Sequence, residues 1–576
     1  MEPEQIKKIK VKNFGLCFSL TIFSAFVFAL ANPNPLFKQG LSFVGWFMYV
    51  PFFFLIKKSF FKTSWLYTGL FGVLCVCAYA FWLYNYDSLC LYIAIPIGFL
   101  ACAILGLALK STEKIFVKNG WLVQFLILCS FDYLRTLGFL GFHYGIAAYT
   151  QWKFTHLIQI CSVIGVFGLN AFVIFSSSLL FAFFSKIEDK KYFLKKMISD
   201  DKHYEGATYI NYVSENSKKL EYASLKLPIV CLCLWFVLFV LIIIQGNIKI
   251  NKTKNFETVT AVTIQNNDDP NENGIDNFTE SVQTLITLTN EALEMNPQIK
   301  LVIWPENAVV PSIVYHFNQE QNTDRKKLVS YVIDYVKNKD ITVSTGNQHI
   351  EVSKDSGKKY YNAALLLDKQ SVNPLNPEIY KKMHLVPFSE YFPYEKYFPH
   401  VYKSILERQK YFSEPGKEIK LFKTQGLSVY TPICFENNFP GLCRQARKQG
   451  AGCFVCLVND SWAKSEVCQY QHLSMAVLRA VENSVPVAVS AVSGQTGFID
   501  PQGRIMAMAV PFTKSYVISE LPVIPSDQKL TVYNTIGDVF GYGIAFLLLV
   551  VLIIRGLIAI INKVICQNAQ KQEKRI

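Results

Sequence analysis

Charged side chains are scarce in this chain. Asp, Glu, Lys and Arg make up 17% of its 576 residues, whereas 51% of the residues are hydrophobic. Soluble domains carry about 25% charged residues, so this composition argues against an ordinary soluble protein and indicates a membrane protein. Long apolar runs fill residues 14–245, a mixed composition fills residues 246–534, and one more apolar run spans residues 539–562.

Signatures of several other functional classes are also missing. The chain has no Gly-rich phosphate loop, no basic helix with base-reading spacing and no internal repeat. These absences argue against nucleotide binding, nucleic-acid recognition and a repeat architecture. The formal net charge of +14 is better explained by the lysine-rich loops of a membrane protein than by a nucleic-acid partner.

The cysteines do not form a pattern that indicates a metal site. Ten of the fifteen lie in or beside apolar segments, where thiols act as small hydrophobic groups. Cys453 and Cys456 form a C-x-x-C pair, but the apolar residues around them are typical of a buried strand, and no second ligand pair follows. We therefore predict no metal and no cofactor. The mixed region contains five cysteines, so at least one thiol there is unpaired.

Eight apolar segments are long enough, or nearly so, to cross a bilayer as helices. A crossing needs about 20 apolar residues, and the second and fifth segments are marginal by that measure. The segments are residues 14–31, 41–56, 65–83, 89–109, 119–135, 157–185, 228–245 and 539–562. We therefore predict a bundle of about eight transmembrane helices, seven of them within residues 1–245 and one within residues 535–576.

Lysines in alternate loops predict the orientation of these helices. They cluster at the N-terminus, in loops 57–64, 110–118 and 186–227, and after the last helix, whereas the opposite loops carry few. Because lysine-rich loops stay in the cytoplasm, residues 246–534 are predicted outside it, in the periplasm of a double-membrane bacterium. Loop 186–227 carries nine lysines and is predicted to be partly disordered.

The first apolar segment has two interpretations. Its basic start and the sequence Ala29-Leu30-Ala31 are also typical of a cleavable signal peptide. We favour an uncleaved helix, because the following segments continue the pattern of a multi-pass protein.

Asp132 and Arg135 form a charged pair within the fifth apolar segment. Their spacing would let them pair on one helix face, which lowers the cost of burying either charge. A structural role and a substrate-binding role are both open.

Residues 246–534 alternate strand-like apolar runs with helical stretches, which predicts an α/β layered domain. The predicted strands are Val259–Gln265, Lys300–Trp304, Ile341–Thr345, Ala363–Leu367, Leu427–Ile433, Gly452–Val458 and Val487–Ala491. The predicted helices are Asp276–Glu294, Thr323–Lys339, Pro440–Lys448 and Tyr470–Asn483. Residues 384–416 are rich in aromatic residues and prolines, and we expect an irregular, mobile connection there of the kind that forms lids and binding loops. Its aromatic side chains could lie at a membrane surface or simply pack on the domain.

Three stretches of this region carry side chains suited to acyl transfer: Ile303-Trp304-Pro305-Glu306, residues 381–390, and Thr431-Pro432-Ile433-Cys434-Phe435-Glu436-Asn437. A thiol attacks as the thiolate and needs a base. A buried glutamate can take its proton, and a lysine ammonium together with a backbone N–H can stabilise the oxyanion. Glu306, Lys382 and Cys434 are therefore the candidate catalytic residues, although each alone could have a purely structural role.

The sequences around these residues resemble the nitrilase superfamily of carbon–nitrogen hydrolases. The whole chain resembles one membrane family within it, the apolipoprotein N-acyltransferases, in its order of seven helices, an α/β domain and a closing helix. In the domain the resemblance rests on Trp304-Pro305-Glu306, Lys382-Met383-His384-Leu385-Val386-Pro387-Phe388-Ser389-Glu390, Ile433-Cys434-Phe435-Glu436, Asn459-Asp460-Ser461-Trp462, Gln471-His472, Arg479-Ala480-Val481-Glu482 and Gly497-Phe498-Ile499-Asp500-Pro501-Gln502-Gly503.

The resemblance implies a fold and a role for each candidate residue. Residues 246–534 would form an extracytoplasmic nitrilase-like α-β-β-α sandwich. Glu306 would be the general base, Lys382 the oxyanion-stabilising lysine and Cys434 the nucleophile, with Glu390 and Glu436 as supporting acids. The enzyme would take an acyl chain from a membrane phospholipid as a thioester on Cys434. It would then pass the chain to the α-amine of a diacylglyceryl-cysteine at the N-terminus of an apolipoprotein, at the surface of the bacterial inner membrane.

The chain departs from the family pattern at several positions. Phe435 stands where the family often has tyrosine, so the supporting residue beside the nucleophile offers no hydroxyl. Loop 266–273 lacks the tryptophan that the family often places there, and residues 493–497 read Ser-Gly-Gln-Thr-Gly where many members have Asn-Asn-Gly. None of these departures affects Glu306, Lys382 or Cys434.

Two other functions are compatible with the same residues. One is a membrane-tethered amidase of the nitrilase type, although seven helices are more than a tether needs. The other is an inactive nitrilase-like scaffold, which the intact Glu306, Lys382 and Cys434 disfavour.

Overall fold

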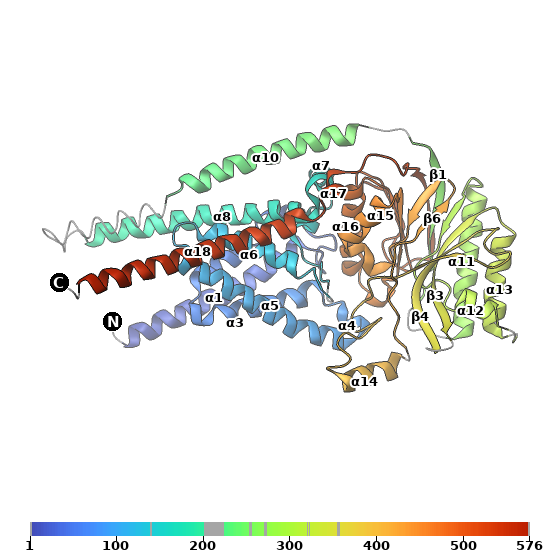
Figure 1. The fold of residues 1–576 in the computed structure, drawn as a ribbon, viewed down its shortest axis with the longest axis horizontal. Helices are drawn as coiled ribbons and strands as arrows, with labels where there is room; N and C mark the ends of the chain where they lie inside the picture. Colours follow the sequence, from blue (N-terminus) through green and yellow to red (C-terminus); the bar gives the residue numbers. More distant parts are fainter. Residues whose placement is uncertain are drawn as a thin grey trace.

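A bundle of long helices and an α/β domain make up the molecule (Figure 1). The computed structural model describes residues 3–138, 141–200, 224–252, 256–269, 274–319, 321, 323–353, 357–409 and 411–573. Residues 201–223, the centre of the predicted lysine-rich loop, lie outside this description, whereas residues 186–200 continue a helix. Both ends of the chain lie at the end of the bundle that is remote from the domain (Figure 1).

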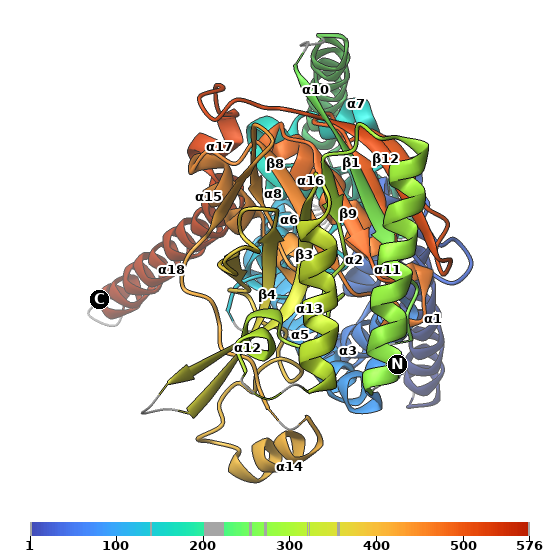
Figure 2. The ribbon, with the colours of Figure 1, turned by 90° about the vertical axis from the view of Figure 1, so that its right-hand side faces the viewer.

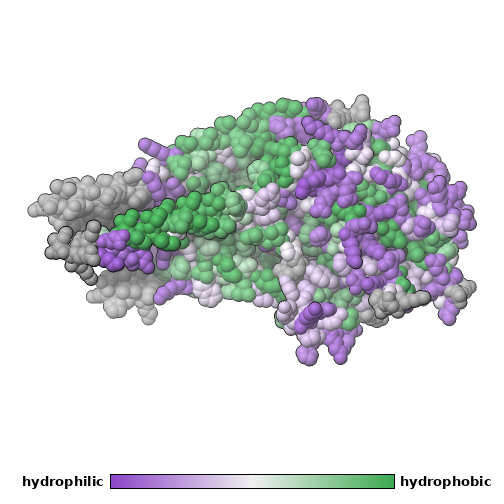
Figure 3. All heavy atoms as spheres, viewed as in Figure 1, coloured by the Kyte–Doolittle hydropathy of each residue, from purple (hydrophilic) through white to green (hydrophobic). Residues whose placement is uncertain are grey.

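Six helices among the described residues are long and apolar enough to cross a membrane. They are α1 (Pro3–Ala31), α3 (Phe61–Tyr79), α5 (Ser88–Ile115), α8 (Cys161–Asp200), α10 (Lys226–Asn251) and α18 (Val539–Glu573). The apolar window of α10 is 11% buried within the protein and that of α18 is 0% buried, so both expose apolar side chains that require a lipid environment. On the face shown in Figure 3, apolar side chains cover most of the coloured part of the bundle.

Two of the predicted crossings differ from these long helices. Residues 41–56 form a short turn, η1 (Ser42–Trp46), and most of the nine-residue helix α2 (Val50–Lys58), which alone, at about 1.5 Å per residue, is too short to span a bilayer. The two elements together run back along α1, because the backbone N–H of Leu41 donates to the carbonyl of Leu30 and Nδ2 of Asn13 donates to the carbonyl of Lys58. Phe52, Phe53, Leu55 and Ile56 of this segment are fully buried inside the bundle. The fifth segment forms α6 (Gly120–Leu134), an apolar helix of 15 residues.

The α/β domain contains two six-stranded sheets. The first has the order β12-β1-β2-β3-β4-β5, with β1 (Thr258–Gln265), β2 (Leu301–Ile303), β3 (Thr342–Ser353), β4 (Gly357–Leu367), β5 (Glu378–Lys381) and β12 (Ser515–Pro522). The second has the order β11-β10-β9-β8-β7-β6, with β6 (Leu421–Thr424), β7 (Leu427–Tyr430), β8 (Cys453–Val458), β9 (Val487–Ala491), β10 (Gly497–Ile499) and β11 (Ile505–Met508). Cys453 and Cys456 lie in strand β8, which is buried throughout, as predicted from the apolar residues around them.

Alternating side chains of the strands build two cores. Val262 and Ile264 of β1 pack with α11 (Ile275–Met295) and α13 (Asp324–Lys337), whereas Ala261 packs in the core that includes the second sheet. Ser490 of β9 donates hydrogen bonds to backbone carbonyls of β1 and β2 and so joins the sheets. Helices α15 (Pro440–Lys448) and α16 (Glu466–Asn483) cover the second sheet (Figures 1 and 2). The layers form the predicted α-β-β-α sandwich.

Helix α16 also faces the membrane bundle (Figure 1). Gln471 in this helix donates to the carbonyl of Tyr79 over 2.8 Å and accepts from the Trp82 indole over 3.1 Å. The amide of Asn85 donates to the carbonyl of Ala463 over 2.7 Å. The domain is therefore fixed to the bundle by hydrogen bonds on the side where α16 lies.

The aromatic connection 384–416 contains a regular element that we did not expect. Pro399 begins the helix α14 (Pro399–Gln409), a position in which proline favours a helix start. Tyr397 and Phe398 just before it are 77% and 57% exposed. The prediction of a wholly irregular segment is therefore wrong, and its mobility stays a prediction.

Candidate active site

Cys434 lies at a tight turn after strand β7. It begins the short turn η4 (Cys434–Asn438) with a backbone φ of 49°, in the left-handed region that residues other than glycine rarely adopt. Its side chain is only 8% exposed. The turn therefore holds the thiol inside the protein, at the end of a strand of the second sheet.

Glu306 and Lys382 reach the same place from the first sheet. Glu306 follows β2, and Lys382 directly follows β5. The ammonium Nζ of Lys382 lies 3.5 Å from Oε1 of Glu306, and the Cys434 thiol and the Glu306 carboxyl are close enough to affect each other's pKa. The structure thus brings together the three residues that the sequence singled out, and their catalytic roles stay a prediction.

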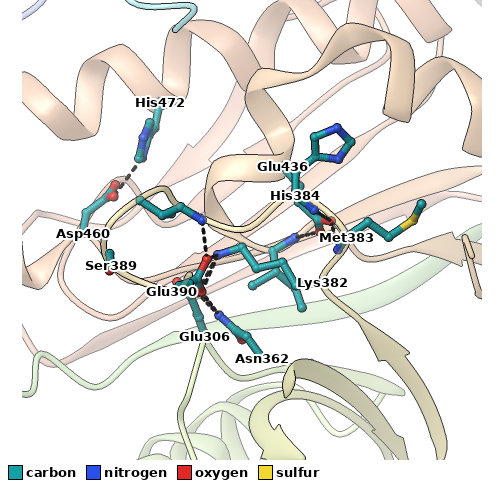
Figure 4. Close-up of polar contacts among 12 residues, drawn as sticks. Glu306, Asn362, Lys382, Met383, His384, Ser389, Glu390, Glu436, Asp460 and His472 are labelled. Carbon is teal, nitrogen blue, oxygen red and sulfur yellow. Dashed lines mark hydrogen bonds and ion pairs between the residues drawn. The ribbon is translucent and has the colours of Figure 1, made fainter. Parts of the chain in front are cut away.

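Asn362 and Glu390 hold this cluster in place (Figure 4). Nδ2 of Asn362 donates to Glu306 over 2.8 Å and to Glu390 over 2.6 Å. Lys382 donates to Glu390 over 2.9 Å, and the backbone N–H of Val386 donates to the second oxygen of Glu390 over 2.8 Å. Glu390 therefore shares Lys382 and Asn362 with Glu306 and orients both.

Burial sets the protonation of the cluster. It raises the pKa of Glu306, against the opposing effect of the Lys382 charge, and it raises the pKa of the Cys434 thiol well above its usual value. Burial opposes the charge on Lys382, but Glu390 and Glu306 more than offset it, so the pKa of Lys382 is raised. The resting site therefore contains a neutral thiol, an ammonium and a carboxylate that accepts protons more readily than an exposed glutamate.

Glu436 fixes the backbone on both sides of the site. Its Oε1 accepts hydrogen bonds from the Tyr380 hydroxyl (2.8 Å) and from the backbone N–H groups of Met383 (2.7 Å) and His384 (3.2 Å). Its Oε2 accepts from the backbone N–H of Ile433 over 2.9 Å. The side chain is fully buried. Glu436 thus ties the segment after Lys382 to the turn that carries the nucleophile.

Replacing Glu436 with glutamine should destabilise the protein by about 1–3 kcal/mol, because an amide nitrogen would meet N–H or O–H donors where the carboxylate accepts from them. The measurement is denaturant unfolding of the detergent-solubilised protein at pH 4.5, where the stability that the wild-type side chain contributes is still present. Glu291 in α11 is exposed, so Glu291→Gln is the matched control and should change stability by less than about 0.5 kcal/mol. Equal stability of the two variants would contradict this role of Glu436.

The same residue predicts a pH dependence. Burial raises the pKa of Glu436 from 4.5 to about 7. Because the pKa is higher in the folded state, the stability that this group contributes is fully present below pH 4.5 and is lost as the pH rises to about 7. The free energy of unfolding should therefore decline with pH across this window, and decline less steeply in Glu436→Gln. Identical slopes would refute the prediction.

A second set of polar side chains lies beside the nucleophile. Nδ1 of His472 lies 2.8 Å from Oδ1 of Asp460, and Nε2 of His472 contacts the Tyr144 hydroxyl. The ligand atoms of Cys434, Asp460 and His472 all lie within 4.8 Å of one another. Thiolate, carboxylate and imidazole are ligands that Zn²⁺ accepts. Among the residues that the structure describes, these three are the group that could hold a metal ion.

Tyr144 comes from the membrane bundle. Arg135 donates to its carbonyl over 2.6 Å and pairs with Asp132 over 3.0 Å, which confirms the predicted pairing of these two charges. Asp132 is 2% exposed and also accepts from Asn170 over 3.1 Å. The buried pair therefore supports a loop of the bundle that reaches the neighbourhood of Cys434.

Phe435, the third supporting residue of the prediction, packs rather than hydrogen-bonds. Its ring meets the ring of Phe439 edge-on at 5.1 Å, and the side chain is 9% exposed. The ring of Phe439 in turn lies 4.2 Å from the ring of His384. Phe435 therefore forms part of an apolar wall next to the nucleophile.

Comparisons with known proteins assign the chain to a family. The model of the apolipoprotein N-acyltransferase N-terminal domain matches residues 24–179, and the carbon-nitrogen hydrolase model matches residues 259–524. Over 580 residues the chain is 34% identical to "Apolipoprotein N-acyltransferase 1" of Treponema denticola, a match that covers 98% of this chain and 100% of the relative. The chain belongs to the apolipoprotein N-acyltransferase family.

Other relatives agree with this assignment. "Apolipoprotein N-acyltransferase 1" of Treponema pallidum is 33% identical over 515 residues, covering 88% of this chain and 90% of the relative. "Apolipoprotein N-acyltransferase" of Borreliella burgdorferi is 27% identical over 545 residues, covering 93% and 95%. The resemblance stated from the sequence motifs is thus confirmed, and the protein is a membrane protein of an acyltransferase family.

Sequence reasoning missed several residues of the site. Asp460 and His472 stand in motifs that carry the resemblance to the apolipoprotein N-acyltransferases, so a signal for them was present. Asn362 and Tyr144 lie in stretches with no recognisable motif. Tyr144 contacts His472 across 328 positions of the sequence, a separation that no local pattern reports.

Proposed function

We propose that the protein N-acylates the α-amino group of the diacylglyceryl-cysteine at the N-terminus of apolipoproteins. The acyl donor is a membrane phospholipid, and the intermediate is a thioester on Cys434. One observation carries the proposal: a carboxylate, an ammonium and a thiol converge in a buried site next to an apolar helix bundle. Both substrates carry lipid chains, so the site has to be close to a bilayer.

In the first half-reaction the Cys434 sulfur attacks the ester carbonyl of the phospholipid, and Glu306 takes the thiol proton. The ammonium of Lys382 and a backbone N–H stabilise the tetrahedral oxyanion. The carbon–oxygen bond to the glycerol breaks, and Glu306 returns the proton to the departing alkoxide. The products are a lysophospholipid and the Cys434 thioester.

In the second half-reaction the α-amine of the acceptor attacks the thioester carbonyl. Glu306 accepts a proton from the attacking nitrogen, and the carbon–sulfur bond breaks. The thiolate leaves and recovers the proton, so an amide forms and the free thiol returns. The raised pKa of Glu306 suits a group that accepts and returns a proton in each half-reaction.

The proposal also includes a place in the cell and a division of the chain. The protein is a multi-pass protein of the bacterial inner membrane, with the catalytic domain of residues 246–534 facing the periplasm. Residues 1–245 form the main membrane domain, and residues 535–576 form the last helix and a cytoplasmic tail. The clustering of lysines in alternate loops supports this orientation.

The test is intact-protein and peptide mass spectrometry after incubation with phospholipid. The wild type should gain the mass of one acyl chain on the peptide that contains Cys434, and hydroxylamine should remove it as it removes a thioester. Cys434→Ala should show no adduct. Cys443→Ala changes another buried thiol of the same domain and should keep the adduct.

Two results would overturn the proposal. A wild type without any acyl adduct at Cys434 would favour an inactive scaffold. Hydrolysis of small soluble amides, without acylation by phospholipid, would favour a tethered amidase.

A further inference from the structure

A polar pocket of about 270 Å³ adjoins the active site. It lies between α4 (Leu83–Tyr86) of the bundle, strands β3 and β4, and the connection that follows Lys382. Its lining residues are Tyr86, Asn307, Gln348, Tyr361, Asn362, Ser389, Glu390, Tyr411 and Ser413. By contrast, the cavity beside Cys434 and His472 measures about 10 Å³, room for about one water molecule.

Two residues connect the pocket with Glu306 and Lys382. Asn362 and Glu390 line it, and the same two side chains hold Glu306 and Lys382. A ligand that fills the pocket therefore touches groups that are one hydrogen bond away from the base and from the oxyanion lysine.

The lining selects the chemistry of the ligand. It consists of hydroxyls, carboxamides and one carboxylate, and it includes no lysine, arginine or histidine. A phosphate group would find no cation there, whereas peptide amides and an ammonium find acceptors and donors. An acyl chain would find few apolar walls.

Asn362 points to a ligand that donates a hydrogen bond. Its side chain is 7% exposed, and its Nδ2 is committed to the two glutamates. Its Oδ1 has no hydrogen-bond partner among the described residues. A buried acceptor without a partner is unfavourable, and an N–H group of a bound ligand would supply the missing hydrogen bond.

The walls of the pocket come from separate parts of the chain that already meet. The Tyr86 hydroxyl of the bundle hydrogen-bonds to Ser389, and Gln348 of β3 donates to the Tyr411 hydroxyl. The Tyr411 ring stacks on Tyr360 with centroids 4.4 Å apart. The pocket is therefore an open cleft with walls from the bundle, the first sheet and the 384–416 connection.

We propose that this pocket binds the polypeptide end of the acceptor: the free α-ammonium and the first peptide units after the lipid-bearing cysteine. The inference rests on the proposed function. The ammonium lies towards Asn362 and Glu390 and loses its first proton to water. The resulting α-amine attacks the thioester, and Glu306 takes the second proton during that attack. The peptide amides lie against Gln348, Tyr411 and Ser413. The lipid chains of the acceptor stay outside this polar pocket.

The test separates the two half-reactions of the full-length protein. Gln348→Ala removes a carboxamide from the pocket, and Tyr411→Phe removes one hydroxyl but keeps the ring that stacks on Tyr360. The first assay is single-turnover acylation of Cys434 by phosphatidylethanolamine or by phosphatidylglycerol. The second is transfer from acylated enzyme to a diacylglyceryl-cysteinyl hexapeptide. Gln298→Ala changes an exposed glutamine and is the control.

Both pocket variants should acylate Cys434 within about twofold of the wild-type rate with either lipid, which also shows that they are folded. Gln348→Ala should raise the KM for the peptide about tenfold with little change in kcat, and Tyr411→Phe should raise it less; the tenfold change corresponds to about 1.4 kcal/mol of binding. The control should match the wild type in both assays.

Two results would overturn the inference. One is an unchanged peptide KM in both variants. The other is slower acylation by phosphatidylethanolamine alone, which would place the ethanolamine ammonium of the donor in the pocket. Failure of the proposed function would look different, because then the wild type itself would form no acyl-Cys434.

Discussion

Replacing Glu306 with glutamine should slow the acylation of Cys434 by about 10²–10⁴-fold and leave the protein folded. Glutamine has nearly the same shape, and its carbonyl can still accept the 2.8 Å hydrogen bond from Asn362. The glutamine side chain cannot accept the thiol proton. Because burial raises the pKa of Cys434, the thiol does not ionise by itself near neutral pH, so removing the base lowers the rate of acylation.

The measurement is the single-turnover rate of thioester formation, followed by mass spectrometry across pH. In the wild type the rate should rise with pH as Glu306 deprotonates, above the usual range of a glutamate because its pKa is raised. Glu306→Gln should lack that rise. Glu390→Gln is the matched control, since Glu390 also bonds Lys382 and Asn362, and its effect should be smaller. A Glu306→Gln variant that acylates at the wild-type rate would rule out Glu306 as the base.

The interior of the catalytic domain can be predicted from its sequence. Strand β9 (Val487–Ala491) and helix α15 (Pro440–Lys448) have the bounds expected from the sequence. A strand buried on both faces is an unbroken apolar run, and a helix with one buried face repeats its apolar residues about every 3.6 positions. Strand β11 (Ile505–Met508), at a sheet edge, was missed. This strand is partly exposed, and its residues show no strand pattern of their own. It forms because it pairs with β10.

The membrane bundle shows a different limit. Residues 41–56 and 65–83 are similarly apolar, yet the first packs inside the bundle as short elements and the second contains a long helix, α3. Hydropathy reports that a segment avoids water. It does not distinguish side chains buried against protein from side chains that face lipid.

The site divides in the same way. Glu306, Lys382 and Cys434 stand in recognisable motifs, so their meeting could be expected. Asn362 bonds two of the glutamates of the site from the middle of an apolar strand, and Tyr144 arrives from the bundle. The positions of Asn362 and Tyr144 depend on how the two sheets and the bundle pack together. No local sequence pattern reports that packing.

Replacing Arg479 with methionine should destabilise the folded protein by about 3–5 kcal/mol. Arg479 and Glu482 of α16 are both fully buried, and their side chains meet at 2.7 Å. Glu482 also accepts a 2.8 Å hydrogen bond from the backbone N–H of Val166, beside the kink of α8 at Gly165. Methionine fills much of the same space but leaves the Glu482 charge buried without its partner, at the point where the domain joins the bundle.

The pH dependence identifies the cause. Burial raises the pKa of Glu482 to about 7 even though Arg479 opposes the shift, so removing Arg479 raises it further. A raised pKa in the folded state means stability that is lost as the pH rises, up to the folded pKa. The stability of Arg479→Met should therefore continue to fall up to a higher pH than that of the wild type. The measurement is denaturant unfolding in detergent, and the difference in the free energy of unfolding between the two proteins should be largest near pH 8–9.

The double variant Arg479→Met with Glu482→Gln provides the control, because it removes both charges. It should recover a large part of the lost stability, since a buried pair costs most when only one partner is deleted. A double variant as unstable as Arg479→Met at every pH would show that the guanidinium acts through packing alone. In that case the buried charge of Glu482 would not be what couples α16 to the membrane bundle.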